Sequence, residues 1–529
     1  MWIRLVTVCA LWSVAAAVII TSARADAIVA DDAYYYFELA RNAAAGKGFT
    51  FDELAPTNGF HPLWAWLLVP VFWLFSASYW VPIHVALALS CACMVATALI
   101  LFRLFARHRS PRAGEIAAYA WLLNPFSIAL VFRGMEGPLN ALVLIASMTM
   151  LDAVRGRGRY AIAEVAALGA TVGLALLARS ENILWLAGVG LVLVWDIPKL
   201  GGLRPTLARA AGFVGALLLV TSPWWIWNLV TFGSIVQTSG EAKQMFQLHG
   251  RLPSVAPQGI DGPGDIWTAL RGAVRNLFLV AESNFRYAAG EEFSAPRLAT
   301  WLARITAAYA AAIVAGALLL RRRPAPEAAG LRALRRNIGA AVVLFFVAHF
   351  LVYTFRIGSY YSWYFLPPVL VACLGLGLSL GFVSSLGRGW SRALAVAHVA
   401  LLVAVSYTFT RGHFMPLPAS REAAYVEVGR SVPPGTRIGL WNAGEVGYFF
   451  SHHFPEVPVI NLDGVVNNEV TRLARAGRYE EYVLENVDVL IEPPGWFGNI
   501  IGPRARPFIA AHVRCRGEAG GRRLCDVVP

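Results

Sequence analysis

The long apolar runs of this chain restrict its fold more than any other feature. Residues 2–21 and 79–105 are each long enough to cross a hydrocarbon core of about 30 Å as a helix. The 529-residue chain is 57% hydrophobic and only 15% charged, which excludes an ordinary soluble globular protein. We therefore predict a polytopic α-helical membrane protein.

The basic residues indicate which loops share a side of the membrane. The formal charge of +13 would suit a nucleic-acid partner. However, Lys and Arg fall mostly in short runs between apolar segments, as the positive-inside rule places them. We expect no nucleic-acid partner. The basic runs are 103–112, 155–159, 199–209, 321–336 and 388–392.

The apolar run 62–76 decides the sidedness of everything after it. As a helix it would extend about 22 Å, which is short of a bilayer core of about 30 Å. If this run crossed the membrane, all five basic runs would lie outside, and if it does not, all five lie inside. We therefore predict that 62–76 is a helix in the outer interface, with Trp64, Trp66 and Trp73 at the headgroup level.

The remaining spans follow from the same pattern and bring the total to about eleven. This count places the N-terminus in the cytoplasm and the C-terminal tail outside. Residues 1–25 are either a retained helix or a cleaved signal peptide, since Ala23-Arg24-Ala25 has the form of a cleavage site. In both cases the residues that follow are expected on the outer side of the membrane. The further spans are 115–132, 137–154, 161–178, 183–195, 209–230, 299–320, 337–355, 361–386 and 392–409.

The chain divides into a membrane domain, 1–410, and a small α/β domain, 411–529. The membrane domain has two large outer loops, 22–78 and 232–298. Short helices are expected within the second loop at 241–248 and 265–282. In the α/β domain we expect strands at 436–441, 457–462 and 487–492, a helix at 469–485, and a hairpin of 508–516 with 522–528.

Six cysteines bear on the compartment. Four of them lie in apolar runs and are expected to be core residues: Cys9, Cys91, Cys93 and Cys373. Cys515 and Cys525 lie in the hairpin of the outer domain, where an oxidising compartment would pair them. The alternative is two free buried thiols.

Two adjacent carboxylates, Asp31 and Asp32, open a short aromatic segment just beyond the first apolar run. Asp32 is a suitable N-cap for a helix 33–45, which leaves Asp31 unexplained. Repulsion between adjacent carboxylates can raise the pKa of one of them, which favours a general base. Their oxygens would equally suit a divalent cation, so Asp31 and Asp32 are also the candidate metal ligands.

Several basic residues break the positive-inside rule and lie at the outer mouth. A cationic cluster beside an acidic pair is suited to hold a lipid phosphate near a base, and an Arg fork can make two hydrogen bonds to it. Each residue alone also reads as a cation that snorkels to the interface. The exceptions are Arg41, Lys47, His61, Arg133, Arg179, Lys243 and Arg356.

The first outer loop resembles that of the GT-C glycosyltransferases, and most closely the group of mycobacterial arabinofuranosyltransferases typified by AftB. The resemblance rests on Asp31-Asp32-Ala33-Tyr34, Gly46-Lys47-Gly48-Phe49 and the run from Thr57 to Trp64. Weaker matches follow in order along nearly the whole chain. They include Gly134-Met135-Glu136, Arg179-Ser180-Glu181, Pro223-Trp224-Trp225, Asn442 to Tyr448, and Leu462-Asp463-Gly464-Val465.

The resemblance implies an inverting transfer of a sugar, such as a pentofuranose, from a polyprenyl-phosphate donor to a hydroxyl of a glycan or lipid-linked acceptor. It places the reaction on the outer face of a bacterial inner membrane. Asp31 would be the base, and Asp32 would orient it, cap the helix or hold a metal. The phosphate would contact Arg179, Lys243, Arg356, Arg133 and Lys47, and the sugars would contact Tyr34, Tyr35, His61, Trp64 and Asn58.

Other residues limit what the resemblance implies. Glu136 and Glu181 are expected to neutralise nearby Arg side chains instead of touching substrate. Ser180 replaces a Pro that relatives often carry, and Gln237-Thr238-Ser239 replaces Pro-Asn-Thr. These departures leave the donor sugar open.

Two other classes of function remain. A transporter or flippase of lipid-linked sugars would be expected to show ionisable residues near mid-membrane and repeated halves, whereas here the charges crowd the outer rim. A non-catalytic assembly protein would bind polysaccharide through residues 411–529.

Overall fold

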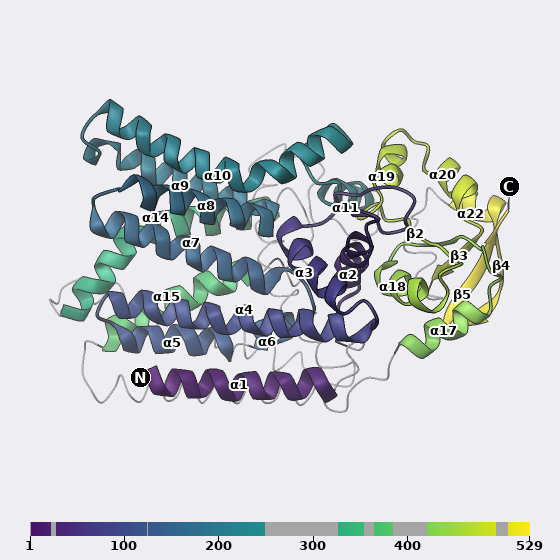
Figure 1. Cartoon of the computed structure of the whole chain (residues 1–529), viewed down its shortest axis with the longest axis horizontal. Coiled ribbons are helices and arrows are strands. Elements are labelled where there is room, and N and C mark those ends of the chain that lie inside the picture. Colours follow the sequence, from purple (N-terminus) through teal and green to yellow (C-terminus); the bar gives the residue numbers. More distant parts are fainter. Residues whose placement is uncertain are drawn as a thin grey trace, which may run out of the picture.

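The computed structural model describes residues 2–22, 28–123, 125–248, 326–353, 364, 366–384, 421–492 and 506–528. Figure 1 shows a bundle of long helices at one end and an α/β domain at the other, with α2 (Asp31–Ala44) and α3 (Pro62–Leu74) between them. The N-terminus lies at the end of the bundle that is distant from the α/β domain. The expected helix 265–282 and spans 299–320 and 392–409 fall outside the described residues.

The bundle is that of a multi-pass membrane protein. Among the described residues, 4 helices are long and apolar enough to cross a membrane: α1 (Trp2–Ser22), α4 (Trp80–Arg107), α7 (Gly137–Arg157) and α10 (Leu203–Phe232). The other helices of the bundle are α5 (Pro111–Leu122), α6 (Pro125–Val131), α8 (Ile162–Ala178), α9 (Ile183–Trp195), α14 (Pro326–Val352) and α15 (Leu366–Ser384).

The expected single span 115–132 is wrong. The structure has two helices there, α5 and α6, and the second begins at Pro125. Pro has no N–H to donate and disfavours the helical conformation of the preceding residue, which favours a break at this point. In contrast, α10 begins at Leu203, earlier than the expected 209, and continues past Pro223.

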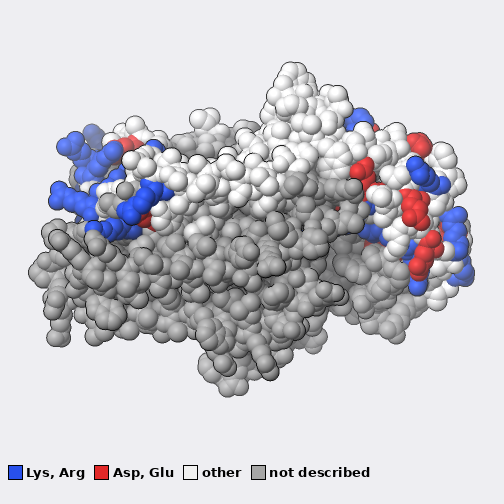
Figure 2. Space-filling model, turned by 90° about the horizontal axis from the view of Figure 1, so that it is seen from below, with Lys and Arg blue, Asp and Glu red and all other residues white. Residues whose placement is uncertain are grey.

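The charged residues separate along the long axis of the molecule. Figure 2 shows Lys and Arg gathered at the end of the bundle that is distant from the α/β domain, whereas Lys, Arg, Asp and Glu are mixed on the α/β domain. The described residues visible between the two ends are mostly uncharged. Arg107 ends α4, and Arg155 and Arg157 lie in the last turn of α7. Arg155 also donates to Arg336 O and shares Asp196 with Lys199. The basic loops that the structure describes therefore share one end of the bundle, as their charge pattern predicts.

The α/β domain is built on a five-stranded sheet with the order β2-β1-β3-β5-β4. Strands β1 (Ile438–Leu440), β2 (Val459–Asn461) and β3 (Val489–Glu492) lie within the three ranges expected from the sequence, and β1 is parallel to both neighbours. Strand β5 (Arg522–Val527) pairs antiparallel with β3 and with β4 (Val513–Ala519). Cys515 and Cys525 form a disulfide across β4 and β5.

Two expected elements of this domain are wrong in detail. The helix 469–485 is divided into α19 (Asn468–Arg475) and α20 (Tyr479–Asn486), because Gly477 between them has a φ of 72°. Phe508 lies in a helix, α22 (Arg506–His512), instead of starting a strand. Its ring packs on that of His512, which is possible at helical i, i+4 spacing.

Helix α18 (Gly444–His453), with α17 (Glu422–Arg430) beside it, joins the α/β domain to α2. The Tyr35 hydroxyl of α2 accepts hydrogen bonds from Ala443 N at 3.1 Å and from Asn461 Nδ2 at 2.9 Å. These partners follow β1 and end β2, so Tyr35 lies at the carboxyl edge of the parallel strands. That edge is where open α/β sheets bind ligands.

Gly444 allows α18 to approach α2 this closely. A Cβ at this position would lie 2.2 Å from the Asp31 carbonyl oxygen. We expect Gly444→Ala to separate the two helices and to cost about 1–3 kcal/mol of stability. Thermal unfolding of the purified protein measures this loss. The matched control is Gly517→Ala, where a Cβ meets nothing within 4 Å, and equal midpoints for the two variants would contradict the close docking.

Candidate active site

The Asp31 carboxylate caps a helix of the α/β domain. Its Oδ1 accepts a hydrogen bond from Glu445 N at 2.9 Å and its Oδ2 accepts one from Gly444 N at 3.3 Å. The expectation that Asp32 caps its own helix is wrong, because α2 begins at Asp31 with Ala30 as a cap that makes no side-chain hydrogen bond. Burial, supported by the charge of Asp32, raises the pKa of Asp31 to about 6, although the two backbone N–H groups act against this rise.

Asp32 faces a cation. Its Oδ2 lies 3.6 Å from Lys243 Nζ, and the two side chains are 28% and 23% exposed. Lys243 belongs to α11 (Thr238–Leu248), at the beginning of the second outer loop. The two aspartates therefore have different surroundings, since Asp31 bonds to backbone N–H groups and Asp32 lies beside an ammonium group.

Asn58 fixes the position of α11 and thus of Lys243. Its Oδ1 accepts hydrogen bonds from Thr238 Oγ1 at 2.6 Å, Thr238 N at 3.2 Å and Asn468 Nδ2 at 3.0 Å. Its Nδ2 donates to Val236 O at 3.3 Å. Asn58 is fully buried. We therefore assign Asn58 a positioning role, because its side-chain amide joins the first outer loop to α11 and to the α/β domain.

Arg179 lies at the centre of a buried ion triad. It ends α8 and is 2% exposed, and its guanidinium bonds to Glu136 through Nη1 and to Glu181 through Nε. Burial disfavours the charged form of Glu181, but Arg179 outweighs this effect and lowers the pKa of Glu181 to about 2. The prediction that Glu136 and Glu181 neutralise an Arg is confirmed. Arg179 is consequently already satisfied by protein carboxylates.

Tyr364 connects the triad to the acidic pair. Its ring centroid lies 5.2 Å from Arg179 Cζ and 5.9 Å from Lys243 Nζ. Its hydroxyl accepts a hydrogen bond from Lys243 Nζ at 3.4 Å. Two of the predicted cations, Arg179 and Lys243, thus meet on one aromatic ring, which is an electrostatically favourable position for them.

His61 offers a polar atom beside this group. Its Nδ1 is buried and has no hydrogen-bond partner within the described part of the chain. Burial and the nearby Arg179 charge lower the pKa of His61 to about 4, so the imidazole is neutral near pH 7. A neutral imidazole that makes no other bond there can donate to or accept from a ligand hydroxyl.

Two of the remaining predicted cations pair with carboxylates other than Asp31 and Asp32. Lys47 pairs with Glu53 at 2.5 Å in the exposed part of the first loop. Arg41 pairs with Glu38 at the other end of α2. Arg133 follows α6, and the Arg133 backbone carbonyl accepts a hydrogen bond from Ala30 N at 3.1 Å. Arg356 lies outside the described residues. Membrane sidedness groups these cations on one face, but it does not set their distances.

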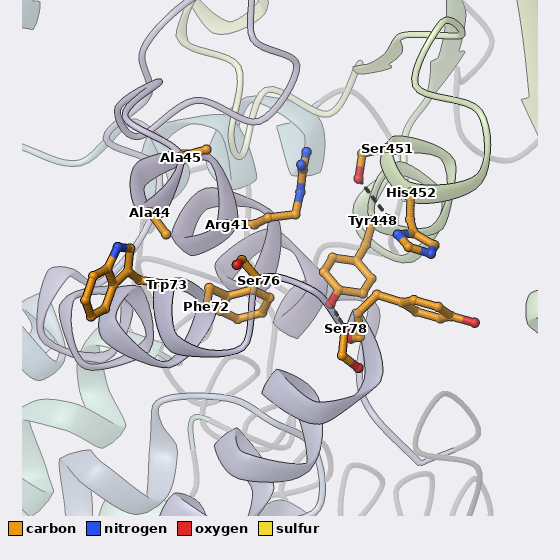
Figure 3. A pocket seen from close by; sticks show the side chains of 11 residues that line it. Arg41, Ala44, Ala45, Phe72, Trp73, Ser76, Ser78, Tyr448, Ser451 and His452 are labelled. Atoms are coloured by element: carbon orange, nitrogen blue, oxygen red, sulfur yellow. Dashed lines mark hydrogen bonds between the residues drawn. The ribbon is translucent and has the colours of Figure 1, made fainter.

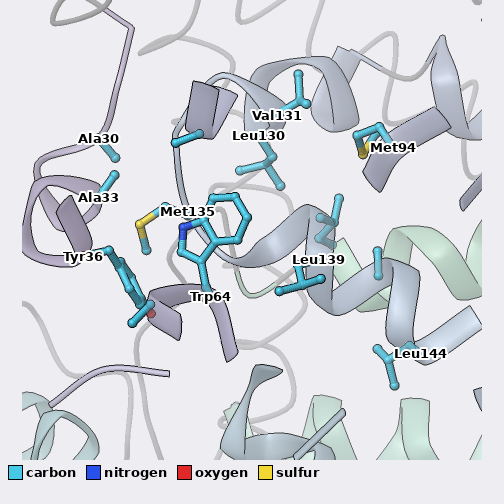
Figure 4. Packing of buried hydrophobic residues seen from close by; sticks show 14 of the residues in the cluster. Ala30, Ala33, Tyr36, Trp64, Met94, Leu130, Val131, Met135, Leu139 and Leu144 are labelled. Carbon is cyan, nitrogen blue, oxygen red and sulfur yellow. The ribbon is translucent and has the colours of Figure 1, made fainter. Parts of the chain in front are cut away.

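Three of the predicted sugar contacts are committed within the protein, two by packing and one by hydrogen bonds. Trp64 is 1% exposed, lies among Met135 and Leu139 (Figure 4), and donates through Nε1 to Gly134 O at 3.1 Å. The expectation that Trp64 lies at the lipid headgroups is therefore wrong, whereas Trp73 is 66% exposed. Tyr34 is fully buried against Tyr448, and Tyr35 makes the interdomain bonds described above.

Asp463 is a residue that the sequence did not single out for chemistry. It follows β2, and its Oδ2 accepts from the Tyr35 hydroxyl at 3.4 Å. Its position directly after a parallel strand was the available signal. In the described part of the chain, no group of three or more His, Cys, Asp or Glu is arranged to hold a metal ion. Among the described residues, Asp31 and Asp32 therefore have no third His, Cys, Asp or Glu arranged with them to hold a metal ion.

Comparison with known proteins identifies the fold. No family model and no curated protein matches the chain. Among solved structures, ArnT from Cupriavidus metallidurans bound to undecaprenyl phosphate aligns with a TM-score of 0.53 and 14% identity, over 98% of this chain and 97% of ArnT. The archaeal oligosaccharyltransferase AglB from Archaeoglobus fulgidus, in complex with an inhibitory peptide and a dolichol-phosphate, aligns with a TM-score of 0.53 and 14% identity, over 96% of this chain and 72% of AglB. The chain therefore shares the fold of these two solved structures.

The buried triad makes a testable prediction about stability. Arg179→Met would leave two buried carboxylates without a counter-charge and should cost about 3–5 kcal/mol. Adding Glu136→Gln and Glu181→Gln should restore part of the loss. Thermal unfolding measures both effects. Arg157→Met is the matched control, because Arg157 is 63% exposed in its pair with Glu164 and its loss should cost at most about 1 kcal/mol. Similar losses for the two Arg variants would refute the triad.

Proposed function

We propose that the protein is an inverting glycosyltransferase that moves a sugar from a polyprenyl-phosphate donor to a hydroxyl of a glycan or lipid-linked acceptor. The observation that carries this proposal is the acidic pair at the start of α2, with Lys243 beside it, between a membrane bundle and a sheet edge. The likeness in fold to proteins bound to undecaprenyl phosphate and dolichol-phosphate supports it.

Asp31 is the proposed base. It would take the proton of the acceptor hydroxyl while that oxygen attacks the anomeric carbon and the bond to the donor phosphate breaks. A pKa of about 6 keeps the carboxylate ionised at neutral pH and still basic enough for proton transfer. The two N–H groups of α18 fix the carboxylate, so little reorganisation accompanies the reaction.

Lys243 is the proposed partner of the leaving phosphate. Its ammonium group would stabilise the charge that develops on the phosphate oxygens as the sugar departs. Arg179 is already paired with two carboxylates, so we assign it a different task. It holds the face of Tyr364, and Tyr364 in turn holds Lys243. His61 would contact a sugar hydroxyl, and Asp32 would orient Lys243.

The finer parts of the proposal come from the sequence. The donor sugar is proposed to be a pentofuranose, and the membrane a bacterial inner membrane with the α/β domain in the periplasm or outside the cell. The sidedness rests on the basic end of the bundle being cytoplasmic. Any divalent cation would have to use the Asp31 and Asp32 oxygens.

The roles of the two aspartates can be separated by mutation. Asp31→Asn should reduce kcat by about 10²–10⁴-fold, because it removes the general base. Asp32→Asn should reduce kcat less and act mainly on the KM of the donor. Release of polyprenyl phosphate from polyprenyl-phospho-sugar measures both. Glu53→Gln, an exposed carboxylate of the same loop, is the control. Full activity of Asp31→Asn together with an inactive Asp32→Asn would reverse the assignment.

The pH dependence gives an independent test. Since the base must be ionised, kcat/KM should fall about tenfold for each pH unit below about 6 and level off above it. The same raised pKa stabilises the fold fully below the ordinary value of 3.8, and this contribution is lost as the pH rises past about 6. Asp31→Asn should remove that step from the stability profile, and an unchanged profile would show that another group titrates.

A further inference from the structure

A pocket lies at the opposite end of α2 from the acidic pair. It has a volume of about 410 Å³, within the range of small-molecule sites. Figure 3 shows Phe72 and Trp73 of α3 on one side and Tyr448 with His452 of α18 on the other. We call it the α2–α18 pocket. Its lining residues are Arg41, Ala44, Ala45, Phe72, Trp73, Ser76, Ser78, Tyr79, Tyr448, Ser451 and His452.

The charges around the pocket are balanced. Arg41 donates to Glu38 through Nε at 3.0 Å and lies 3.8 Å from Glu53 Oε1. Ser451 Oγ donates to the same Glu38 at 3.0 Å. Burial lowers the pKa of His452, so this imidazole is neutral near pH 7. A pocket with its cation already paired does not select a phosphate or an anionic headgroup.

The uncharged part of the lining combines aromatic faces with hydroxyl groups. Trp73 is 66% exposed, so a large apolar face is open to a ligand. The ring centroids of Tyr79 and His452 lie 4.0 Å apart, with the rings tilted by 36°, and together they form an aromatic wall. Ser76, Ser78 and Ser451 add hydroxyl groups. Aromatic faces with neutral hydrogen-bonding groups fit a neutral sugar, which has an apolar C–H face and a rim of hydroxyls.

The walls of the pocket are fixed in advance. The Tyr448 hydroxyl donates to Tyr79 O at 2.5 Å, and the Tyr79 hydroxyl donates to Glu422 at 2.7 Å. These bonds join α18 and α17 of the α/β domain to the turn before α4. A ligand that binds here would therefore spend little free energy on ordering the site.

We infer that the α2–α18 pocket binds a neutral stretch of the acceptor glycan, several sugars away from the hydroxyl that is glycosylated. The inference rests on the proposed function and narrows the acceptor to an oligosaccharide chain. Arg41 is ten residues after Asp31 on one helix, which separates the two places by about 15 Å along α2. A monosaccharide cannot bridge that distance, whereas an oligosaccharide chain can.

Direct binding tests the pocket without turnover. The full chain in nanodiscs is titrated with fluorescent linear tetrasaccharides of arabinose, galactose, mannose or glucose. We expect at least one to bind the wild type, and Trp73→Ala and His452→Ala each to weaken binding at least tenfold. Trp195→Ala is the matched control, because Trp195 is 80% exposed on α9 and should not change binding. His452 lies on the α/β domain, so its effect cannot come from a lost membrane anchor.

Three results would overturn the inference. In the first, no tetrasaccharide binds the wild type. In the second, both pocket variants bind as the wild type does. In the third, phosphatidylglycerol vesicles displace the bound tetrasaccharide from the wild type, which would make the pocket a headgroup site.

A transfer assay distinguishes failure of this inference from failure of the proposed function. Trp73→Ala should raise the KM of the tetrasaccharide acceptor at least fivefold and leave that of its methyl monosaccharide unchanged. Equal KM values for wild type and variant would reject the glycan site while the transferase remains. Absence of transfer by the wild type, with tetrasaccharide binding that depends on Trp73, would reject the proposed function and leave the glycan site.

Discussion

The hydrogen bonds from the N-terminus of α18 to the Asp31 carboxylate join the two halves of this protein at the acidic pair. The first residue of α2 supplies the acceptor, and Gly444 and Glu445 of the distant α/β domain supply the donors. Both helices begin at this carboxylate, so the positive ends of two helix dipoles favour its ionised form. Burial opposes that preference, and the balance leaves a carboxylate that is fixed in place but can still exchange a proton.

Charged residues near Asp31 are paired with residues of opposite charge. Arg179 is buried and would be costly to leave unpaired, and two carboxylates satisfy it. The Arg179 guanidinium also lies over the Tyr364 ring, and the same ring contacts Lys243. Lys243 lies at a more exposed position beside Asp32. Arg179, which is buried and fully paired, therefore helps to hold Lys243 through the Tyr364 ring. This arrangement limits charge–charge repulsion between Arg179 and Lys243, because each cation lies beside at least one carboxylate.

Local patterns in the sequence predicted much of the fold. The three parallel strands, the Cys515–Cys525 pair and the position of the acidic pair at a helix start all follow from short-range signals. The break at Pro125 was also readable, because proline acts on its immediate neighbours. The partner of Asp31 was not readable, since Gly444 is 413 residues away and only the folded chain brings them together. For the same reason Lys47 and Arg41 were grouped with the site, although each pairs with a carboxylate elsewhere.

The position of Tyr35 has a consequence for how such proteins diversify. Its hydroxyl bonds to groups that follow β1 and end β2, and Asn58 connects the first outer loop with both α11 and α19. The α/β domain is thus part of the wall of the site and not an appendage to it. A domain exchanged from a relative would have to bring matching partners for Tyr35 and Asn58. The contact between the two domains therefore changes by coordinated substitution on both sides, and not by recombination of intact modules.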